Sequence, residues 1–201
     1  MWKPDRIYYL NRADRPDRRE HLEDHLKHFG FRPLRVEAKI YPESHGFLNR
    51  AVYGNWMSHT NLISLAKLSE APIVIVEDDV EIVGYTDMLK TIQEVLNLEH
   101  WDMAYFYGSQ DEKLQKIIDT PEFYAYMVNP SSSDLIVEAL ETQRITIEQT
   151  QPKDVSTCID NFMISLQHKM NFYGGTISVI QGGGWGSDTG RGRFWQEVII
   201  N

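Results

Sequence analysis

A run of apolar residues that ends in three carboxylates constrains this chain more than any other feature of its sequence. Residues 72–76 are Pro-Ile-Val-Ile-Val, and Glu77, Asp78 and Asp79 follow directly. A short apolar run that opens with proline and is rich in β-branched side chains predicts a buried β-strand. Three adjacent negative charges repel one another unless a cation lies among them. The run therefore predicts a buried strand whose carboxyl end holds a cation.

The acidic turn, defined as Glu77–Asp79, is predicted to bind a divalent metal. Ligands of α/β sheets bind at the carboxyl ends of central strands, where Mg²⁺ or Mn²⁺ carrying phosphates would neutralise the turn. Side chains alternate along an extended chain, so Glu77 and Asp79 are the predicted metal ligands. Asp78 then points the other way, toward a ribose hydroxyl or a neighbouring basic group. The alternative is a solvated acidic turn, which is common on protein surfaces.

Strand-like and helix-like segments alternate along the rest of the chain. This alternation predicts one three-layer α/β domain over residues 1–201, with a central, mostly parallel mixed sheet flanked by helices. The strand-rich part from Trp101 to Val128 predicts some antiparallel pairing, and periodicity leaves the strand order open. We expect strands at residues 7–10, 34–38, 72–76, 82–83, 101–107, 123–128 and 175–180, and helices at residues 16–29, 55–69, 86–98, 130–140 and 160–169.

Composition and charge exclude several classes of protein. No apolar run approaches the ~18 residues of a membrane span, and no signal-peptide core follows Met1. The one cysteine, Cys158, fits a reducing compartment. A net charge of −9 disfavours broad nucleic-acid binding, which needs a basic face. We therefore expect a cytoplasmic protein for which a nucleic-acid partner is disfavoured but stays open.

Further motifs accompany the acidic turn in a fixed order. Each motif is short and has many chance matches, so their order carries the weight. Together they resemble glycosyltransferase family twenty-five, which includes lipooligosaccharide sugar transferases and the procollagen galactosyltransferase domain. The matching segments are Ile7–Arg12 with Arg15, Asp17 and Arg18; Gly54–His59; Ile73–Val80; Trp101–Gly108; Ala125–Pro130; Ile159–Met163; and Gln181 with Ser187 and Asp188.

The resemblance implies a GT-A-type fold and a metal-dependent transfer of a hexose with inversion at the anomeric carbon. It implies a nucleoside-diphosphate sugar as donor, with uridine diphosphate sugars fitting best, and Mn²⁺ or Mg²⁺ as cofactor. The implied acceptor is a hydroxyl of a glycan, as in lipopolysaccharide biosynthesis, or of another molecule. Asn55 stands where the family usually has an acidic residue, and residues 36–39 lack its usual "A-x-D-G", so the identity of the donor stays open.

The remaining site candidates are assigned roles around the donor. Asn11, Arg12 and Arg15 follow the first predicted strand, where arginine suits phosphate through its paired donors. His59 is expected to contact the donor or the acidic turn, although a lone helical histidine is more often a packed side chain. Asp160 opens a predicted helix and is the expected catalytic base, with a helix N-cap as the alternative.

The glycine-rich segment 182–201 is predicted to be a mobile lid over donor and acceptor. Gln181 and Asp188 match the family and are assigned to the donor site; the alternative for the segment is a frayed terminus.

Two other classes of function stay open. A metal-dependent nucleotidyl or phosphoryl transferase would also use an acidic turn, although the chain has no P-loop or kinase signature. A non-catalytic nucleotide-sugar or carbohydrate-binding module derived from a transferase would be expected to lose the acidic pair or the late aspartate. Both are present here, so the transferase is preferred.

Overall fold

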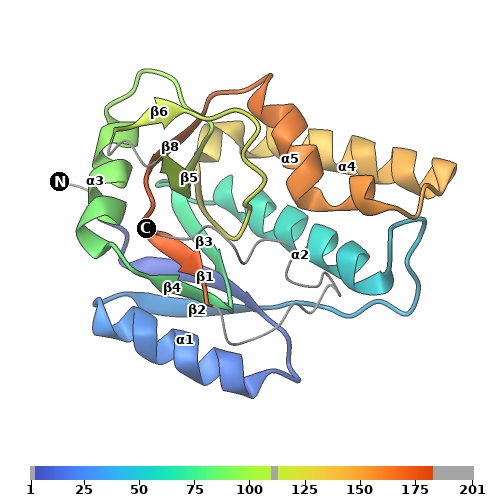
Figure 1. Cartoon of the computed structure of the whole chain (residues 1–201), viewed down its shortest axis with the longest axis horizontal. Coiled ribbons are helices and arrows are strands. Elements are labelled where there is room, and N and C mark those ends of the chain that lie inside the picture. The colour runs from blue at the N-terminus through green and yellow to red at the C-terminus, as the bar shows by residue number, and fades with distance from the viewer. Residues whose placement is uncertain (1–2, 110–112, 183–201) are drawn as a thin grey trace, which may run out of the picture.

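The predicted apolar strand lies inside a seven-stranded sheet, where β3 (Ile73–Glu77) is flanked by β1 and β7. The computed structural model describes residues 3–109 and 113–182 (Figure 1). The sheet order is β2-β1-β3-β7-β5-β8-β6. The other strands are β1 (Arg6–Asn11), β2 (Arg32–Glu37), β5 (Met103–Ser109), β6 (Gln115–Lys116), β7 (Ala125–Val128) and β8 (Phe172–Thr176).

The sheet is mixed and mostly parallel, as predicted. Strands β1, β2 and β3 pair in parallel, and β5 pairs in parallel with β8. Strand β7 runs antiparallel to both β3 and β5, and β6 runs antiparallel to β8. The antiparallel pairing expected between residues 101 and 128 is therefore present as the β5–β7 pair. Because β7 is reversed, the loop that precedes it meets the carboxyl ends of β1 and β3.

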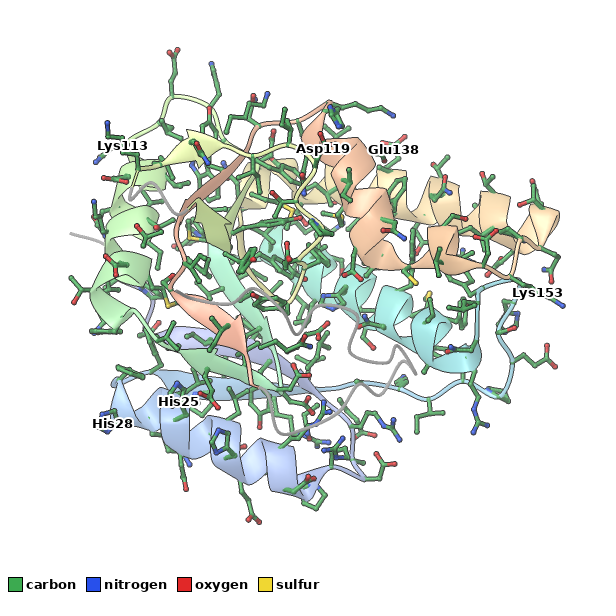
Figure 2. The ribbon with its side chains drawn as sticks, in the orientation of Figure 1. His25, His28, Lys113, Asp119, Glu138 and Lys153 are labelled. Carbon is green, nitrogen blue, oxygen red and sulfur yellow. The ribbon has the colours of Figure 1, made fainter. Side chains whose placement is uncertain are left out.

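Helices cover both faces of the sheet. On one face, α1 (Pro16–His28) and α3 (Tyr85–Leu96) share a hydrophobic cluster with the sheet. On the other face, α2 (Arg50–Ala66), α4 (Ser133–Thr150) and α5 (Ile159–Gln167) share a second cluster, and these three helices lie together in Figure 1. The outward-facing side chains labelled in Figure 2, such as His28, Glu138 and Lys153, are polar. None of the helices in the described ranges is long and apolar enough to cross a membrane.

The chain reverses its direction across the sheet next to β1. It passes from β1 through α1 to β2 on one side, and then through α2 to β3 on the other side of β1. Helices α1 and α2 therefore lie on opposite faces and separate above the carboxyl ends of β1 and β3. In open α/β sheets such a switch point forms the crevice where ligands bind.

Several element boundaries differ from the sequence prediction for local reasons. Helix α2 begins at Arg50 rather than at residue 55, because the side chain of Asn49 accepts hydrogen bonds from the N–H groups of Ala51 and Val52. The single strand expected at 175–180 is two strands, β8 and β9 (Val179–Gln181). Between them, Ser178 donates its N–H to the Phe106 carbonyl, and β9 leaves the main sheet to pair with β4 (Val80–Ile82).

Helix α4 extends ten residues past its expected end, to Thr150. Ile147, which lies beyond that expected end, is buried in the same hydrophobic cluster as α2. The apolar face therefore continues, and the helix ends where Gln151 adopts a left-handed conformation with φ of 53°.

Candidate functional site

The acidic turn lies at the switch point, directly after β3. Asp78 and Asp79 form the two-residue turn between β3 and β4, and both are buried. Asp78 Oδ1 and Asp79 Oδ2 lie 2.9 Å and 3.5 Å from the same atom, Nη1 of Arg18. The turn therefore breaks the strict alternation expected of an extended strand, and these two carboxylates share one cation of the protein itself.

Asp78 connects the acidic turn to the first two strands. Its Oδ2 accepts a 2.7 Å hydrogen bond from Nδ2 of Asn11, the last residue of β1. The Asn11 side-chain oxygen in turn accepts a 2.9 Å bond from Nε of Arg35 in β2. Of the two roles predicted for Asp78, the structure thus displays the contact to a basic group. Asn11 also lies at the carboxyl edge where the sequence placed it.

Arg18 is the residue that sequence reasoning undervalued. The favoured arginines, Arg12 and Arg15, form ion pairs with Asp14 and Asp17 of their own loop and helix start. Arg18 is only 3% exposed. Its position offers the signal that could have found it, because it lies four residues before Leu22 on the buried face of α1.

Asp79 is a buried carboxylate short of partners. It is 6% exposed, and its Oδ2 accepts a 3.0 Å hydrogen bond from Nε2 of Gln181 at the end of β9. Its Oδ1 has no hydrogen-bond partner among the described residues. Burial, reinforced by the charge of Glu77, raises the pKa of Asp79 to about 7 despite the nearby guanidinium of Arg18. The positive charge of Arg18 therefore does not balance the negative charge of the acidic turn.

The Glu77 side chain is held by a buried histidine of α2, His59. His59 lies in α2 and is fully buried; its Nε2 is 3.0 Å from Oε1 of Glu77, and its Nδ1 is 2.7 Å from the Tyr126 hydroxyl. Burial lowers the pKa of His59 to about 4, so the ring is neutral near pH 7. His59 reaches the acidic turn, which was one of its two predicted roles. Because His59 is fully buried, its contact with the crevice runs through Glu77.

Asp160 lies in the first turn of α5, and the N-cap position of that helix is Cys158. The predicted alternative of an N-cap is therefore filled by another residue. The charge of Asp160 is close enough to oppose the lowering of the His59 pKa. Burial raises the pKa of Glu122, in the loop before β7, and Asp160 contributes to this rise. Asp160 and Glu122 thus place negative charge in α5 and in the loop before β7.

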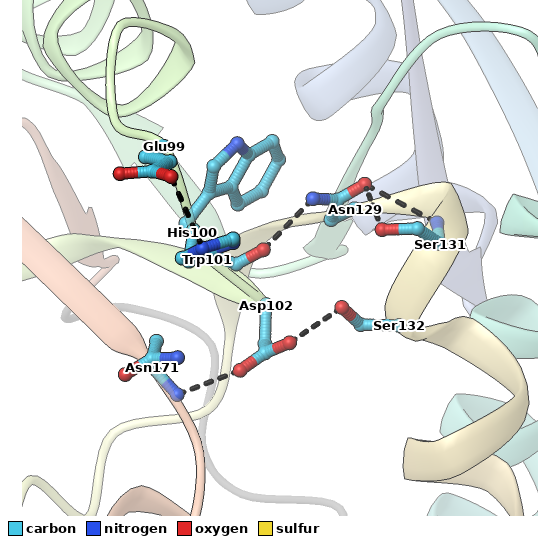
Figure 3. Close-up of a pocket in the computed structure, with 8 residues that line it drawn as sticks. All are labelled: Glu99, His100, Trp101, Asp102, Asn129, Ser131, Ser132 and Asn171. Atoms are coloured by element: carbon cyan, nitrogen blue, oxygen red, sulfur yellow. Dashed lines mark hydrogen bonds and ion pairs between the residues drawn. The ribbon is translucent and has the colours of Figure 1, made fainter.

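A hollow of about 450 Å³ opens at the carboxyl ends of β1 and β2. Residues 12–14 and 37–40 line it, so Arg12 contributes to its wall while Asn11 connects it to the acidic turn. A second hollow of about 230 Å³ lies at the amino ends of β5 and β8 (Figure 3). There the carboxylate of Asp102 accepts hydrogen bonds from the Ser132 hydroxyl and the Asn171 N–H. These bonds connect the residues that precede β5 and β8 with the turn that follows β7. The polar groups of the second hollow are therefore occupied by the fold.

The donor atoms at the acidic turn suit a metal that arrives with a phosphate ligand. Among the described residues, no three His, Cys, Asp or Glu side chains are grouped to hold an ion by themselves. Asp79 offers the orphaned Oδ1, and Glu77 offers a second carboxylate that is 25% exposed. Mg²⁺ usually takes one or two carboxylates and completes its shell with substrate phosphates and water. The residues present fit this kind of site.

The predicted lid and Asp188 lie outside the described residues. Gly182, the last described residue, donates its N–H to the Asp79 carbonyl at 2.6 Å, so the chain leaves β9 at the acidic turn. Gln181 therefore lies against the acidic turn, whereas its role toward the donor and the lid stay predictions.

Comparisons with known proteins find remote likenesses among solved structures. No protein-family model and no curated protein matches the chain. One similar solved structure is a glycosyltransferase involved in glycosylation of the major capsid of PBCV-1, with a TM-score of 0.42 and 10% identity over 70% of this chain and 66% of the other. Another is 4-diphosphocytidyl-2C-methyl-D-erythritolsynthase from Anaerococcus prevotii, with a TM-score of 0.46 and 12% identity over 88% of this chain and 72% of the other. The chain spans just under two thirds of the first protein, and at these identities the activity of neither protein carries over to it.

Proposed function

We propose that this protein is a metal-dependent, inverting glycosyltransferase that moves a sugar from a nucleoside diphosphate to a hydroxyl acceptor. One observation supports this above the others: Asp79 is buried at the switch point, and its Oδ1 has no hydrogen-bond partner within residues 3–109 and 113–182. A buried carboxylate in this state is costly unless a ligand brings a cation. The family resemblance of the sequence is consistent with the same conclusion.

The donor would lie across the carboxyl ends of β1, β2 and β3. The 450 Å³ hollow beside Arg12 is within the size range of small-molecule sites and would take the nucleoside. The diphosphate would then reach the acidic turn, where Asp79 and Glu77 would hold Mn²⁺ or Mg²⁺ with the phosphate oxygens. Once bound, the metal would offset the charge that develops on the departing nucleoside diphosphate. Arg18 keeps Asp78 and Asp79 oriented in the absence of the donor.

The acceptor would approach from the side of α5 and the loop before β7. Asp160 would take the proton from the acceptor hydroxyl as its oxygen attacks the anomeric carbon and the bond to the diphosphate breaks. Glu122, in the loop before β7, lies near enough to Asp160 for their charges to interact, so two carboxyl groups would face the acceptor on this side. The uridine nucleotide, the hexose and the glycan nature of the acceptor are part of the proposal.

The test is a panel of nucleotide sugars incubated with the protein and Mn²⁺, followed by chromatography of the nucleotide products. Slow release of nucleoside diphosphate from one donor, abolished by chelation of the metal, is the expected result. If donor binds and no product forms with any acceptor or with water, the protein is a binding module. If pyrophosphate is released from a nucleoside triphosphate instead, the acidic turn serves nucleotidyl transfer, which this same turn also permits.

A further inference from the structure

The core face of α2 carries a histidine where apolar residues predominate. His59 shares this face with Leu62, Ile63 and Ala66, all of which are fully buried. Burying an imidazole costs free energy unless both ring nitrogens find partners. Here both nitrogens do, and both partners lie on the sheet, so the residue is held by specific contacts and not only by packing.

Hydrogen bonds run in one direction from the core to the acidic turn. A carboxylate only accepts, so His59 Nε2 carries the proton and donates it to Glu77. Nδ1 of the neutral ring then accepts from the Tyr126 hydroxyl, which lies in β7 and is fully buried. The side chain of Glu77 is 25% exposed, whereas Tyr126 and His59 have no exposed surface. Of the three residues, Glu77 is therefore the one that is accessible to a ligand in the crevice.

The rings of this arrangement are also fixed laterally. Phe123 stacks on Tyr126 with ring centroids 4.2 Å apart and planes inclined by 10°. The same Phe123 ring lies 4.9 Å from the His59 ring. The residue directly before β7 also holds the backbone of Glu77, because the Tyr124 carbonyl accepts its N–H at 2.8 Å. Glu77 is thus fixed through its backbone by Tyr124 and through its side chain by His59, which Tyr126 of β7 holds in turn.

We infer that Tyr126 and His59 are positioning residues that set the orientation of the Glu77 carboxylate for the ligand of the acidic turn. This inference rests on the proposed function only in taking that ligand to be a divalent metal with a nucleoside diphosphate. Hydrogen bonds from outside the ligand shell orient metal-binding side chains, and their loss commonly costs about 10–100-fold in metal affinity or activity.

The test uses His59→Leu, His59→Gln and Tyr126→Phe in the full chain, with Tyr105→Phe as the matched control. Tyr105 is a buried tyrosine directly across from Tyr126 in the β5–β7 pair, so its hydroxyl is removed from the same core without touching His59. Binding of Mn²⁺ in the presence of uridine diphosphate is measured by electron paramagnetic resonance, and unfolding by urea gives the stability of each variant.

We expect His59→Leu to weaken Mn²⁺ binding by about tenfold or more, and Tyr126→Phe by less. His59→Gln should recover part of the loss, since its amide can still donate to Glu77. Tyr105→Phe should bind Mn²⁺ as the wild type does. Wild-type Mn²⁺ affinity in His59→Leu, or an equal loss in Tyr105→Phe, would overturn the inference.

Turnover separates this inference from the proposed function. If no nucleotide sugar is turned over and the Mn²⁺ affinities still follow the expected order, the proposed function fails and the positioning role stands. If the wild type transfers sugar and His59→Leu keeps both its kcat and its Mn²⁺ affinity, the positioning role alone fails. The urea data show whether each variant is folded under the conditions of the binding measurement. A loss of Mn²⁺ affinity in a folded variant is then not caused by unfolding.

Discussion

Asp79→Asn is expected to make the protein more stable while removing its function. The folded state raises the pKa of Asp79 from 3.8 to about 7, chiefly through burial, so the folded protein holds this proton more tightly than the unfolded chain. The stability that this proton provides is complete below the unfolded pKa. It is lost as the pH rises from there through the folded value.

The magnitude follows from the size of that shift. A difference of about three units at about 1.4 kcal/mol per unit gives ~4 kcal/mol of lost stability once the pH exceeds the folded pKa. At about pH 5 only the unfolded chain has released the proton, and the loss is ~1.5 kcal/mol. Asparagine has nearly the same shape and no charge, so Asp79→Asn should recover these amounts.

Urea unfolding of the metal-free protein at about pH 5 and about pH 8 measures the difference. Asp78→Asn is the matched control, because the Asp78 carboxylate accepts hydrogen bonds from Arg18 Nη1 at 2.9 Å and from Asn11 Nδ2. That variant should lose about 2 kcal/mol, since a buried guanidinium loses its nearest carboxylate. Mn²⁺ with uridine diphosphate should stabilise the wild type and leave Asp79→Asn unchanged. A gain in Asp79→Asn that is absent, or equal at the two pH values, would refute the reasoning.

Three other outcomes are expected. Arg18→Met should destabilise the protein by about 3–5 kcal/mol in urea, because it strands two buried carboxylates, whereas exposed-loop Arg12→Met should cost less than about 1 kcal/mol. Asp160→Asn should abolish sugar transfer while calorimetry still detects metal-dependent donor binding; retained turnover would remove this residue from the mechanism. Gly54→Ala should lower the melting temperature, because its Cβ would lie 2.6 Å from the Lys39 carbonyl; an unchanged melting temperature would show that the loop yields freely.

The local elements of this fold are largely readable from sequence because their signals are local. The β-branched run before the acidic turn predicts β3, and Pro16 marks the start of α1 at the residue where the helix begins. The alternation of strands and helices predicts the mixed sheet. Boundaries fail where a distant contact decides them, as where Ser178 bonds to Phe106 and divides one expected strand into two.

The candidate site is less predictable, because its contacts are long-range. Asn11, Gln181 and the acidic turn lie at one place as predicted, since each follows a strand that ends at the same edge. Residue type does not distinguish Arg18 from the other arginines near the first strand. Its spacing from Leu22 places it on the buried face of α1, and the packing of that face against the sheet brings it to the acidic turn.

The place of β1 in the interior of the sheet has a kinetic consequence. Its first parallel partner, β2, follows nearby, with Ile7 beside Pro33, but its second partner, β3, brings Ile7 beside Val74. Closing the longer loop is the slower step, and parallel pairing over such separations delays folding. We therefore expect β1 to pair with β2 before it pairs with β3 during synthesis. The hydrogen bond between Asn11 and Asp78 can form only after β3 has paired. We expect the site to be among the last parts of this molecule to acquire its native form.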